Sequence, residues 1–497
     1  MGEVFESCVV GPSEETPRHA LWVSNLDSVA ARGFTPTVYF YRSGPAGPAG
    51  EAVAALKAAL GRALVRFYPL AGRLGADRSG RVRIECTGEG AAFSAARSDS
   101  TADEFARDFA PSPDLRRRFV PPADSADPPC PLLMLQVTFL KCGGMALGFA
   151  IHHLAFDGRG ASLFIQTFSR IARGADLASL PPPFFDRTLL RARSPPSVLF
   201  DHSDSTAFSD SNANNDNTAA AAAIVSPVVT AHLALSKSQL QSLKSRCGSA
   251  TGPATPRVST FRAVVAHVWR CACIARGLAG DVQTELYLPV DVRARLVPPL
   301  PAGYIGNAGI RTKAVLTVDE LISSSFADIA ETIQNAVDRV NDDYVRSFID
   351  HLDTADANTL YIGNAGIRTK AVLTVDELIS SSFADIAETI QNAVDRVNDD
   401  YVRSFIDHLD TADANTLSLP RTSLCAISWL GMPMHDADFG WGEPEFMSRA
   451  QMYGSGYVYL MSTPGNEGGV SVILGLENES MRLFKKIFYE EPACIEG

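Results

Sequence analysis

The amino-acid sequence predicts a two-domain α/β protein with mixed sheets and a functional site in the cleft between the domains. The chain has 497 residues, enough for two substantial cores, and 46% of them are hydrophobic. Apolar runs typical of strands alternate with amphipathic helical spacings in both halves. A segment at 201–227, rich in Ser, Asp, Asn and Ala, predicts a solvated crossover linker. We therefore expect an N-terminal domain at 1–200 and a C-terminal domain at 228–497.

The N-terminal half contains an expected helix from Glu51 to Ala63 and, later, an expected β-hairpin. Apolar runs at Leu132–Thr138 and Met145–Ile151 flank a glycine-containing turn at 141–144, which is typical of two strands with a tight connection. Residues 160–173 then have the spacing of an amphipathic helix. The short segment before that helix therefore lies at a strand-to-helix junction.

The C-terminal half is expected to begin with a strand at Val228–Leu235. A helix follows near residue 260, with Ser259 or Thr260 as its N-cap. Further apolar runs predict strands at Leu424–Trp429, Gly456–Met461 and Gly469–Leu474. Strands and helices thus alternate in this half too, which favours mixed sheets.

A tandem repeat interrupts the C-terminal half, since residues 304–360 recur letter for letter as residues 361–417. Each copy carries ten acidic and four basic residues, so one copy accounts for half of the formal net charge of −12. One copy predicts a strand followed by helical segments. Solenoid repeats usually number three or more and diverge, so two identical copies indicate a recent in-frame duplication or an error in gene assembly. A fold with room for one copy would extrude the other, and its apolar helix face would favour self-association.

Charge, cysteine content and the N-terminus narrow the classes of function. The net charge of −12 argues against nucleic acid as a partner, because phosphate binding needs clustered Lys and Arg. The nine cysteines include no CxxC pair, so neither a disulfide framework nor a metal site is expected. The N-terminus has no basic start with an apolar segment, and no stretch of about 18 apolar residues occurs. These features favour a reducing, cytoplasmic location without a membrane partner.

The segment at 149–158 carries residues suited to acid–base chemistry. It places an imidazole, a carboxylate and a glycine where a buried strand ends, namely His153, Asp157 and Gly158. This is the local chemistry of a supported general base. A lone HxxxD also occurs by chance, so a buried histidine that is hydrogen-bonded at a strand end is an equally good interpretation. The neighbouring His152 would point to the opposite face of the strand and is interpreted as structural.

A second motif, Asp438-Phe439-Gly440-Trp441-Gly442, lies in the C-terminal half. Alone it indicates a tight glycine turn, in which Asp438, Gly440 and Gly442 are structural and the aspartate caps or pairs locally. Together, the HxxxDG and DFGWG motifs make the chain resemble the plant BAHD acyltransferases, which transfer acyl groups from coenzyme A thioesters to alcohols or amines. The resemblance covers nearly the whole chain, and it is carried further by the FYPLAGRL stretch and by segments within 16–27, 35–41, 185–187 and 291–296. Within the family, the chain is similar to the hydroxycinnamoyl-CoA shikimate/quinate hydroxycinnamoyltransferases.

This resemblance implies a chloramphenicol-acetyltransferase-like fold with an active-site channel between the two domains. It also implies transfer of a hydroxycinnamoyl or related aromatic acyl group from an acyl-CoA co-substrate to an amine or alcohol, by a monomer with no permanently bound cofactor. Direct attack without an acyl-enzyme is expected, since no GxSxG elbow or reactive-cysteine pattern occurs. Three alternatives remain open: acylation of shikimate or quinate, an inactive relative disrupted by the duplication, and a hydrolase that uses the same histidine on water.

The resemblance also implies roles for individual residues. His153 would take the acceptor's proton and return it to the coenzyme A thiolate. Asp157 would be structural, turned away from the imidazole and paired with an arginine, for which Arg293 is the best candidate. Gly158 would allow the close turn that this geometry requires. Trp429 matches a tryptophan whose indole N–H can stabilise the oxyanion, although a core aromatic is an equally good interpretation.

Four further residues are expected near the two substrates. The helix that begins near Ser259 offers backbone N–H groups and Arg257 a positive charge for a phosphate of coenzyme A, but an ordinary capped helix is the simpler alternative. In the shikimate and quinate transferases, an arginine two residues after the tryptophan grips the acceptor carboxylate. Here that position is Gly431, and Ile427 replaces a threonine. Because a buried carboxylate needs a charged partner, we expect shikimate and quinate to be poor substrates and an acceptor without a carboxylate to be favoured.

Overall fold

The computed structural model describes residues 3–30, 33–44, 47–78, 80–107, 109–122, 129–202, 227–246, 258–354, 419–463 and 468–490. The second copy of the repeat, at 361–417, and almost all of the predicted linker at 201–227 lie outside these residues. The described helices and strands all belong to one compact unit, formed by Met1–Thr354 and Ser418–Gly497.

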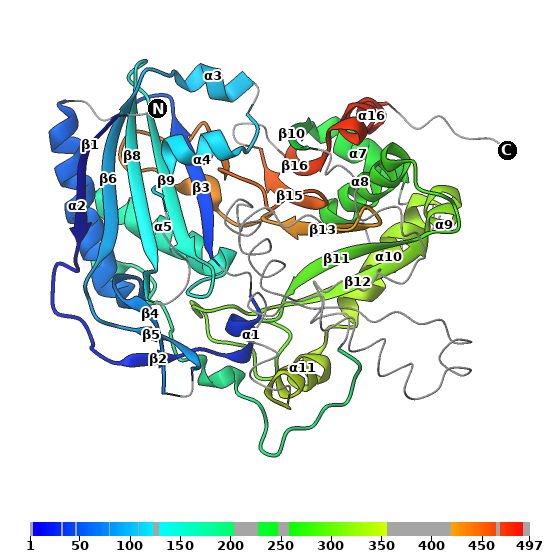
Figure 1. The fold of residues 1–497 in the computed structure, drawn as a ribbon, viewed down its shortest axis with the longest axis horizontal. Coiled ribbons are helices and arrows are strands. Elements are labelled where there is room, and N and C mark those ends of the chain that lie inside the picture. The colour runs from blue at the N-terminus through cyan, green and yellow to red at the C-terminus, as the bar shows by residue number, and fades with distance from the viewer. Residues whose placement is uncertain are drawn as a thin grey trace, which may run out of the picture. The chain divides into compact units, whose positions relative to one another are not determined.

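A six-stranded mixed sheet dominates the N-terminal half (Figure 1). Its strands, in spatial order, are β1 (Glu3–Val10), β6 (Ala91–Ser98), β8 (Leu133–Leu140), β9 (Met145–His152), β3 (Phe34–Tyr41) and β14 (Phe446–Arg449). Neighbouring strands are antiparallel except for the parallel pair β6 and β8. Helices α2 (Ala49–Arg66) and α5 (Gly158–Ala172) pack against each other on one side of this sheet. The edge strand β14 comes from the C-terminal half of the chain, so the two halves interlock.

Smaller elements surround this sheet. A four-stranded sheet consists of β2 (Ala20–Trp22), β5 (Val82–Glu85), β4 (Arg73–Ala76) and β7 (Cys130–Pro131). The short helices of this half are α1 (Asn25–Ser28), α3 (Ala102–Arg107), α4 (Pro113–Phe119) and the 3-10 turns η1 (Tyr68–Ala71), η2 (Leu177–Ser179) and η3 (Arg187–Leu190).

A second six-stranded mixed sheet forms the C-terminal half. Its strands, in spatial order, are β10 (Val228–Leu235), β16 (Val470–Glu477), β15 (Tyr457–Ser462), β13 (Ser423–Ser428), β11 (Gln283–Asp291) and β12 (Gly309–Thr317). Its helices are α7 (Lys237–Arg246), α8 (Thr260–Arg276), α9 (Val318–Ser323), α10 (Phe326–Asp338), α11 (Asp342–Thr354) and α16 (Asn478–Tyr489), with a 3-10 turn η4 (Met434–Asp436). The α/β fold with mixed sheets that the sequence predicts is confirmed.

The two faces of this second sheet belong to different cores. Leu286, Ala426 and Val458 pack with the residues of α8 and α10 in one buried cluster. Their neighbours along the same strands, such as Tyr287 and Cys425, belong to the cluster that also contains the strands of the first sheet. Because side chains alternate between the faces of a strand, one face is covered by helices and the other faces the N-terminal half.

The first copy of the repeat is part of this fold, since β12, α9, α10 and α11 all come from it. Asp350 on α11 accepts hydrogen bonds from the backbone N–H groups of Arg193 and Ser197 and forms an ion pair with the Arg193 guanidinium at 2.6 Å. Ser347, also on α11, is hydrogen-bonded to the ring of His202 at 2.8 Å. The segment at 193–202, at the end of the N-terminal half, is therefore held against α11 by hydrogen bonds and an ion pair. Among the described residues, no helix is long and apolar enough to cross a membrane.

Candidate active site

The HxxxDG motif lies between the end of β9 and the start of α5, at the strand-to-helix junction that the sequence predicts. The backbone N–H of His153 donates to the carbonyl of Gly33 at 2.9 Å, which continues the pairing of β9 with β3 by one residue. The side chain of His153 therefore lies on the same face of the sheet as that of Ile151. His152, on the other face, is buried and packs edge-on against the ring of Phe34.

The imidazole of His153 is held in its neutral form. Burial lowers its pKa below the ordinary 6.5, a shift that Asp157 opposes and that Arg449 reinforces. Its Nδ1 atom is buried and makes no hydrogen bond with any described residue. A neutral imidazole with an uncommitted nitrogen can accept a proton, which is the property that a general base requires.

Both oxygens of Asp157 are engaged in holding the backbone. Oδ1 accepts from the N–H of Gly160 at 3.1 Å, which makes Asp157 the N-cap of α5. Oδ2 lies 2.8 Å from Nη1 of Arg293 and accepts from the N–H of Ala308 at 3.2 Å. The structure thus brings Asp157 and Arg293 together, as the resemblance implies, and ties the motif to the loop that leads into β12.

Gly158 differs from the expectation of a close turn. It is the first residue of α5, and it is not among the described glycines with positive φ. A Cβ built on it would lie 3.5 Å from Sδ of Met432 and 3.6 Å from Nε1 of Trp429. The glycine therefore leaves room beside Trp429, because a side chain longer than a methyl group would meet the indole.

A buried network that the sequence analysis missed holds the other side of the motif. Nδ2 of Asn307 donates to the carbonyl of His153 at 2.9 Å and to Oδ1 of Asp27 at 3.0 Å. Arg187 forms an ion pair with Asp27 at 3.3 Å, with both side chains fully buried, and donates to the carbonyl of Ala155 at 2.6 Å. Asp27 and Arg187 occur in segments that carry the resemblance, but no local pattern shows that they converge on residues 153–155.

Trp429 follows β13 and lies against the motif. Its side chain is buried, and its ring packs edge-on against Tyr459 at 5.3 Å between centroids. Its indole nitrogen is directed toward Gly158, as the 3.6 Å separation from a built Cβ shows. His153 and the N–H edge of Trp429 therefore approach the same junction from the two sheets.

The DFGWG motif lies at the opposite end of α5. Oδ1 of Asp438 accepts from the N–H groups of Gly440 at 2.8 Å and Gly442 at 3.0 Å, and Oδ2 pairs with Arg173 at 3.1 Å. Both glycines have positive φ, +108° and +98°. Arg173 caps the C-terminus of α5, and a helix of 15 residues is roughly 22 Å long. The structure therefore does not bring this motif to His153; its contacts stabilise a tight turn.

The remaining predicted residues are distributed differently. Ser259 is the N-cap of α8, and its side chain accepts from the N–H of Arg262 at 3.3 Å, whereas Arg257 lies outside the described residues. Ile427 lies on β13 opposite Tyr459 of β15, two residues before Trp429. Gly431 has φ +73°, and no heavy atom lies within 4 Å of a Cβ built on it. A side chain at position 431 would therefore meet no neighbouring atom, but the positive φ of the backbone there favours glycine.

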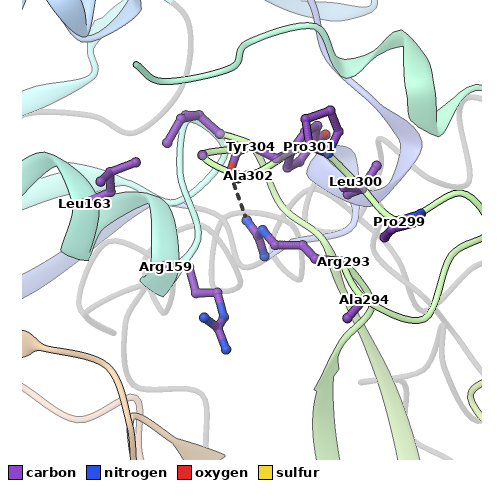
Figure 2. A pocket seen from close by; sticks show the side chains of 11 residues that line it. Arg159, Leu163, Arg293, Ala294, Pro299, Leu300, Pro301, Ala302 and Tyr304 are labelled. Carbon is purple, nitrogen blue, oxygen red and sulfur yellow. Dashed lines mark hydrogen bonds between the residues drawn. The ribbon is translucent and has the colours of Figure 1, made fainter. Parts of the chain in front are cut away.

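A cavity of about 330 Å³ adjoins the structural side of the motif (Figure 2). It is lined by Arg159 and Leu163 of α5, by Arg293 and by the loop from Pro299 to Ile305. In Figure 2 the guanidinium of Arg293 points toward Tyr304, whose carbonyl it contacts at 3.4 Å. Neither His153 nor Trp429 lines this cavity.

Two mixed sheets covered by helices, with strand β14 shared between the halves of the chain, form a chloramphenicol-acetyltransferase-like α/β fold. The structure is similar to that of vinorine synthase, with a TM-score of 0.65 at 18% identity, over 97% of this chain and 96% of the other. The family model described as the Transferase family matches residues 2–360 and 352–491. The chain therefore belongs to this family, the BAHD acyltransferases, and it is an acyltransferase with an acyl-CoA as co-substrate.

Two curated relatives span almost the full length. Putrescine hydroxycinnamoyltransferase 1 of Oryza sativa subsp. japonica is 42% identical, over 99% of both chains. Hydroxycinnamoyl-CoA:5-hydroxyanthranilate N-hydroxycinnamoyltransferase HHT4 of Avena sativa is 36% identical, over 97% of this chain and 98% of its own. The names of these relatives share the hydroxycinnamoyl group and differ in the acceptor.

Proposed function

We propose that this protein transfers a hydroxycinnamoyl or related aromatic acyl group from its coenzyme A thioester to a small amine or alcohol. The observation that carries the proposal is that His153, whose pKa burial lowers, precedes the strand-to-helix junction at which the indole N–H of Trp429 lies beside Gly158. The names of the full-length relatives support the acyl group, because both are hydroxycinnamoyltransferases. Both act on amines by name, which favours an amine over an alcohol.

The chemistry needs one base and one hydrogen-bond donor. His153 accepts the proton of the attacking amine or hydroxyl as that atom forms a bond to the thioester carbonyl carbon, a role worth about 10²- to 10⁴-fold in rate. The carbonyl oxygen becomes an oxyanion, and the indole N–H of Trp429 donates a hydrogen bond to it. The intermediate then collapses, the carbon–sulfur bond breaks, and the coenzyme A thiolate takes the proton back from His153. No acyl-enzyme is formed.

The remaining predicted residues support this site in other ways. Asp157, with Arg293, fixes the start of α5 and thereby the position of His153. The aspartate and glycines of DFGWG hold the turn at the far end of the same helix. We place a phosphate of coenzyme A near Ser259 at the N-terminus of α8, with Arg257 as its charged partner.

An acceptor panel tests the proposal directly. The full chain is incubated with p-coumaroyl-CoA and, in turn, putrescine, agmatine, tyramine, tryptamine, simple alcohols and shikimate, with conjugate measured by mass spectrometry and free thiol by a colorimetric reagent. We expect conjugate and thiol in equal amounts, and loss of both in His153→Ala but not in His19→Ala, which replaces an exposed histidine. Thiol release with free acid and no conjugate would identify a hydrolase instead. No turnover with any acceptor would favour an inactive relative.

A further inference from the structure

A buried arginine shares a sheet face with the proposed catalytic base. Arg449 ends β14 and pairs with Thr37 of β3, which in turn pairs with Phe149 of β9. Residues directly opposite each other in antiparallel strands lie on one face, and every second residue along a strand returns to it. The face that carries Arg449 and Thr37 therefore also carries Thr35 and, at the end of β9, His153.

The three polar residues Arg449, Thr35 and His153 form a diagonal line across three adjacent strands. Each step crosses one strand and advances two residues, and such diagonal neighbours are about 7–8 Å apart. The Cα atoms of His153 and Arg449 are therefore roughly 15 Å apart, with Thr35 midway. The charge of Arg449 acts on His153 across this face, since burial is the main cause of the lowered pKa of the imidazole and Arg449 lowers it further.

Arg449 is 3% exposed; burial lowers the pKa of its guanidinium, but Tyr453 and Tyr459 raise it above the ordinary value, so the group stays charged. Its Nε donates to the carbonyl of Gln451 at 3.1 Å, and its cation lies over the rings of Tyr453 at 4.2 Å and Tyr459 at 5.2 Å. Its Nη2 is buried without a hydrogen bond to any described residue, and the described ion pairs include none to Arg449. A buried cation that keeps an unsatisfied N–H donor is suited to bind an anionic ligand.

Two further contacts direct that ligand toward the reacting atoms. Oγ1 of Thr35, between the arginine and the histidine, is also buried without a described hydrogen-bond partner. Tyr459 packs against Arg449 on one side and against Trp429 on the other. The cation of Arg449 thus lies on the face of the first sheet that also carries His153, not on the loop of Gly431.

We infer that Arg449 is a specificity-determining residue that binds a carboxylate of the acceptor while the nucleophilic nitrogen of the same molecule lies at His153. The inference rests on the proposed function and narrows it to amines that carry a carboxylate a few bonds from the nitrogen. A terminal ammonium group in the same place would be repelled by the guanidinium. The substrate class is therefore an amino acid or aminobenzoate rather than a diamine.

Matched acceptor pairs test this inference with the full chain. Each pair differs in the carboxylate, with p-coumaroyl-CoA as the donor throughout: 4-aminobutyrate has one where putrescine has a second amine, and anthranilate has one that aniline lacks. A charge-assisted hydrogen bond favours the carboxylate-bearing member by about 10- to 100-fold in kcat/KM. Arg449→Gln should lower kcat/KM for that member at least tenfold more than for its partner, and Arg449→Lys, which keeps the charge, should retain part of the preference.

The outcomes separate the inference from the proposed function. Conjugates of putrescine and aniline in preference to the carboxylates would overturn the inference and leave the proposed function standing. An equal loss for both members of a pair in Arg449→Gln would also overturn it, because a merely structural arginine affects both alike. If Arg449→Gln shows no cooperative thermal unfolding, the preference of the unaltered protein decides alone. No conjugate from any of the four amines, together with none from the wider panel, would refute the proposed function itself.

Discussion

Replacing Asp157 distinguishes a carboxylate that holds the fold from one that assists His153. In Asp157→Ala the N-cap of α5 is lost, which costs about 1 kcal/mol, and so is the hydrogen bond from Ala308, which costs about 1 kcal/mol. Breaking a buried ion pair costs about 3–5 kcal/mol. Arg293 keeps its contacts with Asp291 at 3.2 Å and with the carbonyl of Gly306 at 3.1 Å, so we take the cost of losing the Asp157–Arg293 ion pair as about 2 kcal/mol. The sum is about 4 kcal/mol.

Asp157→Asn is the informative partner variant. Asparagine caps a helix as well as aspartate does, so its oxygen can still accept from Gly160. The NH₂ group that replaces Oδ2 accepts neither from Arg293 nor from the N–H of Ala308, and we expect a destabilisation of about 3 kcal/mol. Urea unfolding followed by tryptophan fluorescence gives the free energies of unfolding, with equal m-values checking that the unfolded states are comparable. Asp186→Asn, at an exposed cap of η3, is the matched control and should change stability by about 0.5 kcal/mol or less.

Activity decides between the two roles. A carboxylate that only positions the helix should leave kcat of the folded Asp157→Asn protein within about tenfold, because His153 keeps its own contacts to Gly33 and Asn307. An aspartate that orients a catalytic histidine loses about 10⁴-fold on conversion to asparagine with the fold intact. An unchanged urea midpoint with a loss of that size would refute the structural role.

Three further predictions address the base, the oxyanion donor and the repeat. Because burial lowers the pKa of His153 below 6.5, kcat/KM should fall toward acid pH, as the imidazole becomes protonated, with a midpoint below 6.5; an acid limb with a midpoint above 6.5 contradicts this. Trp429→Phe keeps an aromatic ring against Tyr459 but removes the N–H, so kcat should fall about 10²- to 10³-fold, whereas a core aromatic would lose little. A chain that lacks residues 361–417 should stay active and elute with less aggregate in size-exclusion chromatography; inactivity and insolubility of that chain alone would rule out a dispensable duplication.

Local patterns carry most of what could be predicted of the fold. The hairpin of β8 and β9 follows from two apolar runs around a glycine turn, and α8 begins where Ser259 predicts its cap. β14 is different, because it has four residues and acquires its place only by pairing with β3, far earlier in the chain. Such a strand has no periodicity long enough to predict it.

The candidate site shows the same division between local and long-range information. The spacing of His153 and Asp157 shows that both lie at one junction, but the two residues have separate partners. No local pattern marks Arg449, because it lies on β14, a strand apart from both the HxxxDG segment and Trp429. The register of β14 places the cation of Arg449 against Tyr459, near Trp429. Gly431 alone therefore does not determine whether the protein binds an acceptor carboxylate.

The duplication adds a constraint on any mutational test within the first copy. Asn307 and Asp350 recur as Asn364 and Asp407 in an identical sequence, so we expect the second copy to compete with the first for the same contacts. If the second copy replaced the first in the fold, the free energy of folding would change only by the difference in loop-closure entropy, because the loop would come before the folded copy instead of after it. Loop-closure entropy depends weakly on loop length. In the full chain, Asn364 would then take the place of the substituted Asn307, and kcat would change little. In a chain without residues 361–417, the same substitution would remove the hydrogen bond to the carbonyl of His153 and lower kcat. Asn307→Ala compared in both chains therefore measures whether the two copies compete for one place in the fold.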